Sequence, residues 1–329
     1  MDGLKIACFL FAACLAASLL PQQAASTTAT DEGVHGWIEI MNDDNFTAEN
    51  GVTGGNGTYD NPYIIENRLI DLSQNTEYQS HDGIYVARTS ASFVIRNVKV
   101  HSGLVTISPS SFTGGCGIRL QDLYNGIVED CEFTGDLTGL EISNCQNIVV
   151  RNNDILHNNR GLSAWRSHGL HVEGNNISSN TYGNIEFYQV IQSDLVNNTV
   201  ILSTDWMGIN LYESEDCEVH GNEIILNGGV GVNIGYCKDC KITNNTIAHN
   251  GVGITIYGSE DILALPNGFS FNHKDIENWD DDNSINPWTL LISVIAIVAA
   301  VVVAVAMMTR WRKKKPARIQ PPPIVDRPT

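Results

Sequence analysis

The most distinctive candidate site residues are four aromatic side chains that recur at nearly regular intervals. Trp165, Tyr188 and Tyr212 follow one another at almost equal spacing, and Tyr257 follows two such intervals later. An exposed row of flat rings offers surfaces on which sugar rings stack. The same rings could instead pack only against one another and stabilise a sheet face, and we regard that simpler interpretation as the stronger one. The row is still the best candidate binding surface in the sequence.

Three aspartates follow the same spacing, namely Asp216, Asp239 and Asp261. If they stack, their negative charges repel one another unless a cation or the nearby Lys238 and Lys241 offsets them. Carboxylates grouped in this way could bind Ca²⁺, which is the one cofactor for which we find candidate ligands. Solvated aspartates in turns are the simpler explanation, and they require no cofactor.

Cysteines provide a third candidate chemistry. Six of them lie outside the apolar N-terminal segment: Cys116, Cys131, Cys145, Cys217, Cys237 and Cys240. Outside the cell, an even number suggests disulfides. Cys217 and Cys240 occupy equivalent places in neighbouring repeats, where stacked Cα atoms would lie about 5 Å apart and permit a disulfide. The run Cys237–Cys240 also has the spacing of a metal or redox motif, but no second such motif accompanies it.

Carboxylates that could support lyase or hydrolase chemistry lie one repeat interval from basic residues, with which they can form ion pairs. One repeat interval separates Arg119 from Glu141, and the same interval separates Glu129, Arg151 and Glu173, so the sign of the charge alternates. Such columns are most simply weak surface ion pairs. The motif set of polygalacturonases is absent, and we find no lyase motif. The sequence therefore favours a protein that is not an enzyme, and we assign no catalytic residue.

An internal repeat with a period of about 22–24 residues determines how these side chains are positioned. It begins with a glycine and two apolar residues at alternate positions, as in Gly139-Leu140-Glu141-Ile142. The apolar residues alternate with period two over segments too short for helices, which indicates short strands. Fourteen residues after each start, six of seven positions hold asparagine: Asn153, Asn175, Asn198, Asn222, Asn245 and Asn267.

These features predict an all-β fold, a right-handed parallel β-helix of about eight rungs of 22–25 residues. One rung cannot bury its apolar side alone, whereas stacked rungs share one core and pair strand to strand. The asparagines would form a structural ladder, bonding to one another and to turn backbone in the left-handed conformation that asparagine tolerates. A leucine-rich solenoid is disfavoured because the repeat contains no helical face.

Residues 83–267 resemble the repeats of pectate-lyase-like β-helix proteins. Asn152-Asn153-Asp154-Ile155 and Asn244-Asn245-Thr246-Ile247 are similar to repeats of the periplasmic copper-binding NosD-type proteins and of the carbohydrate-binding and sugar-hydrolysis (CASH) modules of archaeal surface proteins. The segment from Trp37 resembles the entry segment that caps the coil in such archaeal proteins. The resemblance implies the fold, but these repeats occur in lyases, hydrolases and non-enzymes alike.

The two ends of the chain are typical of targeting segments. Residues 1–25 combine Lys5, an apolar run and small residues, as a secretory signal peptide does. Residues 288–309 carry no charge and are long enough to form a transmembrane helix, and the basic, proline-rich tail at 310–329 predicts a cytoplasmic C-terminus. Between these ends we expect a capping segment at 26–82, the β-helix at 83–270 and an acidic linker at 271–287.

The charge of the predicted ectodomain excludes one class of partner. Residues 26–287 contain 11 basic and 35 acidic side chains, a net charge of −24, which repels nucleic acid. Sequons for N-glycosylation occur at Asn45, Asn56, Asn176, Asn197 and Asn244.

Together, these features predict a single-pass protein of the cell membrane whose extracellular β-helix has a structural or binding role, with a glycan or another envelope component as partner. A polysaccharide lyase or glycoside hydrolase, and a copper-delivery protein, are the alternatives. The oligomeric state is not determined.

Overall fold

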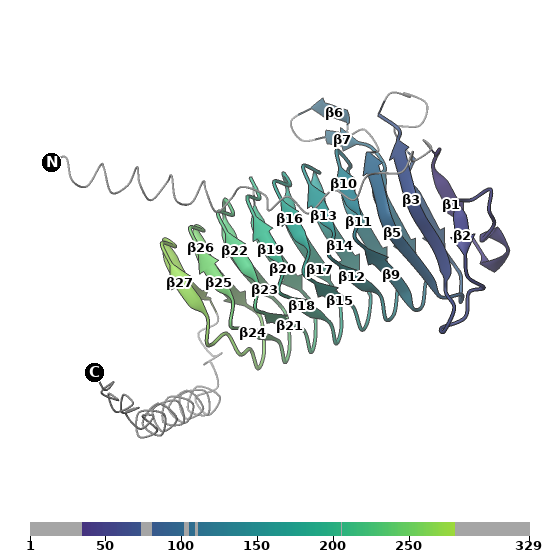
Figure 1. Ribbon diagram of the computed structural model, residues 1–329. Helices are drawn as coiled ribbons and strands as arrows, with labels where there is room; N and C mark the ends of the chain where they lie inside the picture. Colours follow the sequence, from purple (N-terminus) through teal and green to yellow (C-terminus); the bar gives the residue numbers. More distant parts are fainter. Residues whose placement is uncertain (1–34, 74–80, 102–104, 109–110, 205, 280–329) are drawn as a thin grey trace, which may run out of the picture. The chain divides into compact units, whose positions relative to one another are not determined.

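The described part of the chain is a parallel β-solenoid. The computed structural model describes residues 35–279, with gaps at 74–80, 102–104, 109–110 and 205. All of the described residues belong to one compact unit. The solenoid has about seven turns, one fewer than expected (Figure 1). Among the described residues the one helix is the 3₁₀ turn η1 (Asp43–Asn45).

One face of the solenoid is a ten-stranded sheet, to which each of the roughly seven full turns contributes one strand and the incomplete turns at the two ends contribute the others. Its strands pair in parallel and in register, so that Leu140 lies beside Leu162 and Leu162 beside Ile185. In order, they are β1 (Ile38–Ile40), β4 (Ile84–Ala87), β8 (Cys116–Gln121), β11 (Thr138–Ser143), β14 (Arg160–Trp165), β17 (Gly183–Tyr188), β20 (Met207–Tyr212), β23 (Val230–Gly235), β26 (Val252–Tyr257) and β28 (Lys274–Asn278).

The other faces belong to a sixteen-stranded sheet with two rows of short strands. The first row is β9 (Gly126–Glu129), β12 (Val149–Arg151), β15 (His171–Glu173), β18 (Asp194–Val196), β21 (Glu218–His220) and β24 (Lys241–Thr243). The second is β10 (Glu132–Thr134), β13 (Asp154–Leu156), β16 (Asn176–Ser178), β19 (Thr199–Ile201), β22 (Glu223–Ile225), β25 (Thr246–Ala248) and β27 (Gly268–Ser270). The long strands β3 (Tyr63–Asp71) and β5 (Phe93–His101) join the rows, β2 (Val52–Gly54) pairs with β3, and β6 (Val105–Ser108) and β7 (Ser111–Thr113) form a separate hairpin.

The sheets extend beyond the expected limits of the repeat. Strand β1 already belongs to the ten-stranded sheet, and β28 continues it to Asn278. Residues before Gly83 and after Ser270 therefore pair with the coil although they lack the glycine and asparagine signals of the repeat. The transmembrane segment predicted at 288–309 and the signal peptide predicted at 1–25 lie outside the described residues. In the part that is described, no helix is long and apolar enough to cross a membrane.

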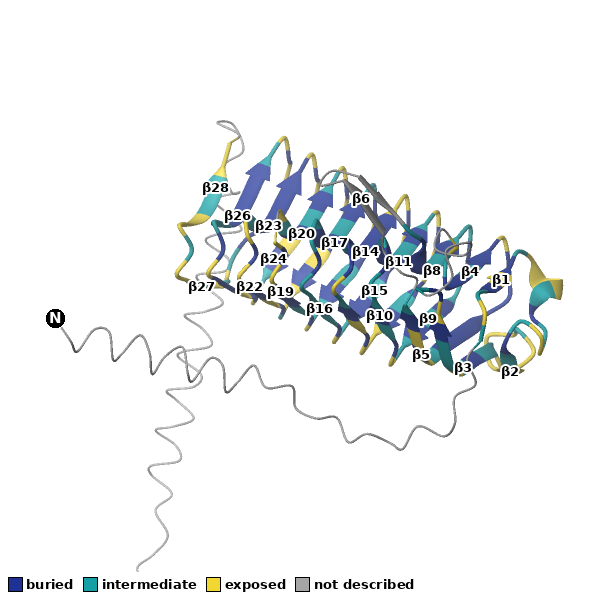
Figure 2. Cartoon of the chain, turned by 90° about the horizontal axis from the view of Figure 1, so that it is seen from above, coloured by how far each residue is buried: buried dark blue, intermediate teal, exposed yellow. Residues whose placement is uncertain are grey.

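The core lies inside the coil, where short strands joined by tight corners direct their inward side chains. Inward residues of all three strand rows, such as Ile142, Val150 and Ile155, are fully buried. Figure 2 shows buried strands in dark blue and exposed corners in yellow. A typical turn has four residues at positive φ, for example Asn144, Asn147, Asn152 and His157. Asparagine and aspartate are frequent at these corners because their side chains tolerate this conformation.

The asparagines fourteen residues after each repeat start form a single buried file. The Oδ1 atom of Asn198 accepts hydrogen bonds from the backbone N–H and the Nδ2 of Asn175, both at 3.0 Å. Its own Nδ2 donates to the Val172 carbonyl at 2.9 Å and to Oδ1 of Asn222 at 3.0 Å. One expectation was wrong: the left-handed residue is not the ladder asparagine but, at every ladder position before Asn267, the residue that precedes it, such as Asn152. The ladder asparagine itself faces inward, where it can bond to the next turn.

A second buried polar column lies nineteen residues after each start: Asp136, Asn158, Asn180, Ser203, Asn227, Asn250 and Asn272. This column explains why the repeat begins with glycine. A Cβ on Gly139 would lie 2.8 Å from Nδ2 of Asn158, and one on Gly208 would lie 2.7 Å from Nδ2 of Asn227. The glycine is required because the asparagine of its own turn fills that space.

One turn deviates at both of these positions. It has Ser203 in the asparagine column and Asn184 in the glycine position. The Asn184 side chain fills the space that Ser203 leaves, since its Oδ1 accepts from Asn180 Nδ2 at 2.8 Å and its Nδ2 donates to Asn227 Oδ1 at 3.0 Å. The two deviations therefore compensate each other and keep the column connected.

Candidate functional site

A groove runs along the outer face of the ten-stranded sheet. One hollow lies over β14, β17 and β20 and is lined by Arg160, Trp165, Glu186 and Trp206, among others. A second hollow, over β20 to β28, continues from the first, because Met207 lines both. We call the two hollows together the sheet groove.

A continuous row of six aromatic rings, which we call the aromatic wall, runs beside the sheet groove, and four of its members line the hollows: Trp165, Tyr188, Tyr257 and Trp279. Successive ring centroids are 5.0, 5.1, 5.4, 5.5 and 6.1 Å apart along the row Trp165, Tyr188, Tyr212, Tyr236, Tyr257 and Trp279. The sequence had identified four of these six residues. The structure thus brings the predicted stripe together and adds Tyr236 and Trp279.

Tyr236 enters the row from the neighbouring sequence position. The aromatic column has Gly235 at this turn, and the next residue adopts positive φ, which turns its ring into the row. The Tyr257 ring leans over the glycine, so that a Cβ there would lie 2.5 Å from its Cζ. A reading by strict repeat spacing misses this substitution because it compares only equivalent positions.

The rings in the middle of the wall cover one another. The planes of Tyr188 and Tyr212 differ by only 12°, and those of Trp165 and Tyr188 by 33°. At centroid distances near 5 Å, the Tyr188–Tyr212 pair is stacked and the Trp165–Tyr188 pair is tilted, and each ring hides part of its neighbour's face. Trp165 and Trp279 at the two ends are 43% and 66% exposed, and Tyr236 between them is 55% exposed, so these three residues offer the most surface to a ligand.

The opposite side of the first hollow has its own aromatic residues. Tyr182 and Trp206 meet edge to face with centroids 4.7 Å apart, and the Arg160 guanidinium lies 4.8 Å from the centre of the Tyr182 ring. Trp206 is 43% exposed. Tyr182 and Trp206 are 24 residues apart, each two residues before the start of its repeat, so the sequence held a second periodic aromatic pair that the predicted stripe did not include.

The floor between these aromatic residues is polar. Glu186 points out of β17, with Arg160 Nε 3.3 Å from its Oε2, and Asn210 follows at the equivalent position of β20. Burial raises the pKa of Glu186, an effect that the positive charge of Arg160 partly offsets. The groove therefore combines flat apolar walls with a carboxyl group and amides that can bond to hydroxyls.

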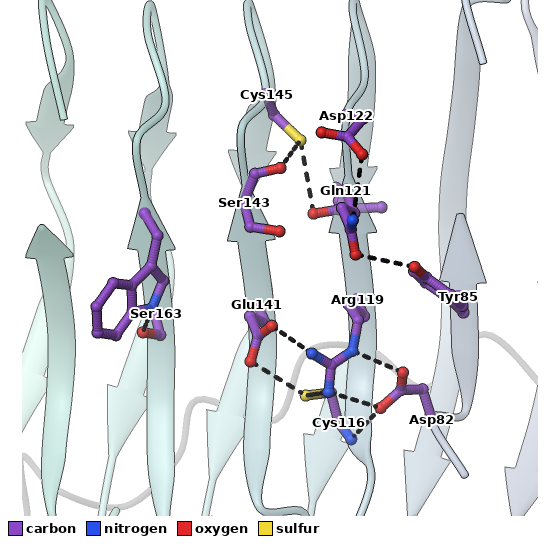
Figure 3. Close-up of polar contacts among 12 residues, drawn as sticks. Asp82, Tyr85, Cys116, Arg119, Gln121, Asp122, Glu141, Ser143, Cys145 and Ser163 are labelled. Carbon is purple, nitrogen blue, oxygen red and sulfur yellow. Dashed lines mark hydrogen bonds and ion pairs between the residues drawn. The ribbon is translucent and has the colours of Figure 1, made fainter. Parts of the chain in front are cut away.

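A charged cluster lies on the same sheet, toward its N-terminal end. Figure 3 shows Arg119 between Asp82 and Glu141, with Cys116 beside them. The Nε of Arg119 lies 2.7 Å from Asp82, and its Nη1 lies 2.5 Å from Glu141. Burial, with the adjacent carboxylates, raises the pKa of the Cys116 thiol. Two carboxylates share one guanidinium here, which leaves the group one net negative charge.

The predicted Cys217–Cys240 disulfide is absent, and none of the six cysteines in the described part is disulfide-bonded. The prediction considered only stacking between turns. The corner also brings Cys237 to the same place, so Cys240 hydrogen-bonds to two thiols. These bonds lower the pKa of Cys240 and raise the pKa of Cys217 and of Cys237.

The candidate calcium ligands Asp216, Asp239 and Asp261 lie at one corner of successive turns. All three have positive φ, between 52° and 55°, as expected of aspartates in turns. They line a shallow hollow with Lys241, whose Nζ bonds instead to Glu218 at 2.5 Å. Among the described residues, no group of three or more His, Cys, Asp or Glu side chains is arranged to hold a metal ion. The residues present therefore do not fit either Ca²⁺ or copper.

The sequons differ in accessibility. Asn56, Asn197 and Asn244 are exposed, whereas Asn45 and Asn176 are half-buried. The Asn176 side chain donates to Asp154 at 2.9 Å, which ties down the amide that a glycan would modify. Glycosylation stays a prediction, strongest at the three exposed positions.

Comparisons with known proteins agree with this architecture. A family model described as "Right handed beta helix region" matches residues 82–204, and one described as "Periplasmic copper-binding protein (NosD)" matches residues 192–286. The search of curated proteins gives no match.

Two solved structures show the same fold. Tailspike protein 2 of bacteriophage CBA120 is 14% identical, with a TM-score of 0.54 over 66% of this chain and 38% of the tailspike chain. PfbA, a surface adhesin of Streptococcus pneumoniae, is 15% identical, with a TM-score of 0.54 over 67% of this chain and 62% of the adhesin. This chain thus spans less than two thirds of either protein. The family matches and the parallel solenoid together identify it as a β-helix repeat protein, and residues 192–286 are similar to the NosD family.

Proposed function

We propose that this chain is a surface protein that acts outside the cytoplasm and binds a glycan along the sheet groove. The NosD family is described as periplasmic and the structurally similar PfbA as a surface adhesin, and both descriptions support an extracytoplasmic role. The uncharged segment 288–309 would anchor the protein in the membrane with its C-terminus in the cytoplasm.

The observation that carries the proposal is the pairing of aromatic walls with a polar floor. A sugar ring has one apolar face and a rim of hydroxyls, so it is bound well by an aromatic surface beside hydrogen-bonding groups. Trp165 and Trp206 line the same hollow, and Glu186 and Asn210 lie between the walls. The groove continues for several turns, which suits a polymer more than a single sugar.

A glycan array followed by calorimetry with the full-length chain tests the proposal. Trp206→Ala and Trp165→Ala each remove an exposed ring from the groove, and each should weaken binding of the selected glycan at least about tenfold. Tyr124→Ala is the matched control, because Tyr124 is 48% exposed but does not line the groove. Equal affinity in all three variants, or no glycan bound by the wild type, would contradict the proposal.

Copper delivery has less support. The family match suggests it, but the described residues present no metal-binding group of three or more ligands. The three clustered cysteines hydrogen-bond to one another at a buried corner. We therefore assign no metal-dependent step to this protein.

A further inference from the structure

The C-terminal end of the coil presents two exposed aromatic side chains. Phe271 is 72% exposed and Trp279 is 66% exposed, and among the described residues only Tyr59, between β2 and β3, is a more exposed large hydrophobic residue. Phe271 follows β27 and Trp279 follows β28, which are the last strands of their sheets in the described part of the chain. Figure 2 shows these two strands at the end of the coil opposite β1 and β2.

Each of the two rings contacts the preceding turn on one side. The Phe271 ring stacks on that of His249, with centroids 4.9 Å apart and planes that differ by 11°. Trp279 ends the aromatic wall, and its ring centroid lies 6.1 Å from that of Tyr257. No described residue of a following turn covers the other side of either ring. The uncovered side of Phe271 therefore faces along the coil axis, away from the coil, and Trp279 lies at the same end.

The charge of this end excludes two kinds of partner. Residues 258–279 carry four acidic side chains (Glu260, Asp261, Asp275 and Glu277) and one basic side chain, Lys274. The lysine Nζ lies 2.9 Å from Glu277, and residues 280–282 add three aspartates. An anionic surface would be repelled, and a second copy stacked end to end would bring the same negative charges together. The partner must accept aromatic rings without adding negative charge.

The place of the uncharged segment 288–309 in the sequence favours a lipid surface as this partner. Eight residues, 280–287, separate Trp279 from Trp288, and even a fully extended chain spans at most about 30 Å over this distance. A membrane-spanning segment 288–309 would therefore hold this end of the coil close to the bilayer. Strand β1 lies nine strand spacings, about 43 Å, farther along the coil. The short tether gives the C-terminal end a high effective concentration of lipid, so a weak contact suffices.

We infer that the C-terminal end of the coil rests on the outer surface of the membrane, with the Phe271 and Trp279 rings inserted among uncharged lipid headgroups; this inference rests on the proposed anchoring by segment 288–309. The indole of Trp279 suits this level because its ring leaves water while its N–H stays hydrated. Phe271 gains from the burial of apolar surface. The headgroup region contains water, so it also satisfies the outer edges of β27 and β28, which the hydrocarbon core could not do.

This placement orients the sheet groove. Successive strands of the ten-stranded sheet follow one another along the coil axis, so the groove runs away from the membrane, from Trp279 toward Trp165. Five strand spacings from β28 to β14 put Trp165 about 24 Å farther from the bilayer than Trp279. The coil thus stands upright on the membrane and presents its first hollow to polymers in the surroundings.

Fluorescence quenching by brominated phosphatidylcholine tests the contact in the full-length chain, reconstituted in vesicles of that lipid. Trp288→Phe and Trp311→Phe first remove the two tryptophans that flank the uncharged segment. Bromine atoms near the top of the acyl chains quench only tryptophans at the membrane surface. We expect quenching in this background, and Trp279→Phe should remove most of it, because the remaining tryptophans lie farther along the coil.

Two variants of the background that lacks Trp279 compare the ends of the coil. Phe271→Trp should restore quenching, whereas Tyr59→Trp should not, although Tyr59 is 81% exposed. Both changes exchange one exposed ring for another and leave the core as it is. Equal quenching of the two variants would show that neither end is held at the membrane and would overturn the inference.

Flotation of the vesicles after a carbonate wash separates this inference from the proposed anchoring. A chain that does not float with the vesicles would overturn both. A chain that floats, but whose quenching depends on neither Trp279 nor the tryptophan of Phe271→Trp, would overturn the membrane contact alone. Glycan binding on the array is measured independently of either result.

Discussion

The inward asparagine columns and the outward face of the ten-stranded sheet share one register, but they differ in how much the residue type changes from turn to turn. Asn175, Asn198 and Asn222 meet the same surroundings in each turn and make the same four kinds of hydrogen bond. Outward positions at the same spacing hold Glu141, Ser163 and Glu186 in succession. A buried polar group must find its partner within the protein, whereas water satisfies any outward residue. Residues that differ from turn to turn on the outer face can therefore form a site.

The largest effect should come from interrupting the first asparagine column. Asn198→Ala removes four hydrogen bonds and leaves the Asn175 N–H, the Asn175 amide and the Val172 carbonyl without their partner. We expect a loss of about 3 kcal/mol in the free energy of unfolding, measured by urea denaturation. A loss below about 1 kcal/mol would show that water replaces the amide and that the column is not required for stability.

The second column tests whether two deviations compensate. Ser203→Asn should collide with the Asn184 side chain, and Asn184→Gly should remove one hydrogen bond each from Asn180 and Asn227, so each change should cost about 2 kcal/mol. The double variant restores the glycine and asparagine found in other turns and should be close to wild type. A double-mutant cycle on unfolding free energies measures this coupling, and simple additivity would contradict it.

On the outer face, Glu186 should make stability depend on pH. Its pKa is raised above the ordinary value of 4.5 in the folded protein, so the folded state holds this proton more tightly than the unfolded state does. Stability should therefore fall as pH rises through the interval between those two pKa values and then level off. Glu186→Gln should lack this component, as thermal unfolding from pH 4 upward would reveal. Parallel profiles for both proteins would argue against a raised pKa.

The smallest effect should come from an outward ion pair away from the groove. The Nη2 of Arg151 lies 2.5 Å from Glu129, but 47% of the arginine side chain is exposed. We expect Arg151→Ala to change the unfolding free energy by less than about 1 kcal/mol, with the difference shrinking in high salt. A loss as large as that of Asn198→Ala would erase the contrast between the inner columns and the outer face.

Much of the fold could be predicted because the repeat period indicates which residues are neighbours along the coil. Asn153, Asn175 and Asn245 were expected in one file, and the structure places them there. The second column was equally periodic, and its signal lay in the sequence nineteen residues after each start. It was missed because the glycine of each turn was not paired with the asparagine that fills its space.

The candidate site was only half predictable. Trp165, Tyr188, Tyr212 and Tyr257 share a column, so their spacing revealed them. Tyr236 is displaced by one residue, and its ring joins the row only because its backbone adopts positive φ. Tyr182 and Trp206 occupy equivalent positions 24 residues apart, but only the width of the sheet brings this pair opposite the aromatic wall.

The sequence by itself determined the neighbours along the coil axis, because its nearly constant repeat period sets strand register, the apolar core and the asparagine file. Only the tertiary structure decided which side chains at non-equivalent positions meet, such as Asn184 with Asn227, Cys240 with Cys237, and Arg160 with Tyr182. The physical reason is that contacts between equivalent positions follow from repetition alone. Contacts between non-equivalent positions depend on the conformation of each corner and the rotamer of each side chain, and neither of these is periodic.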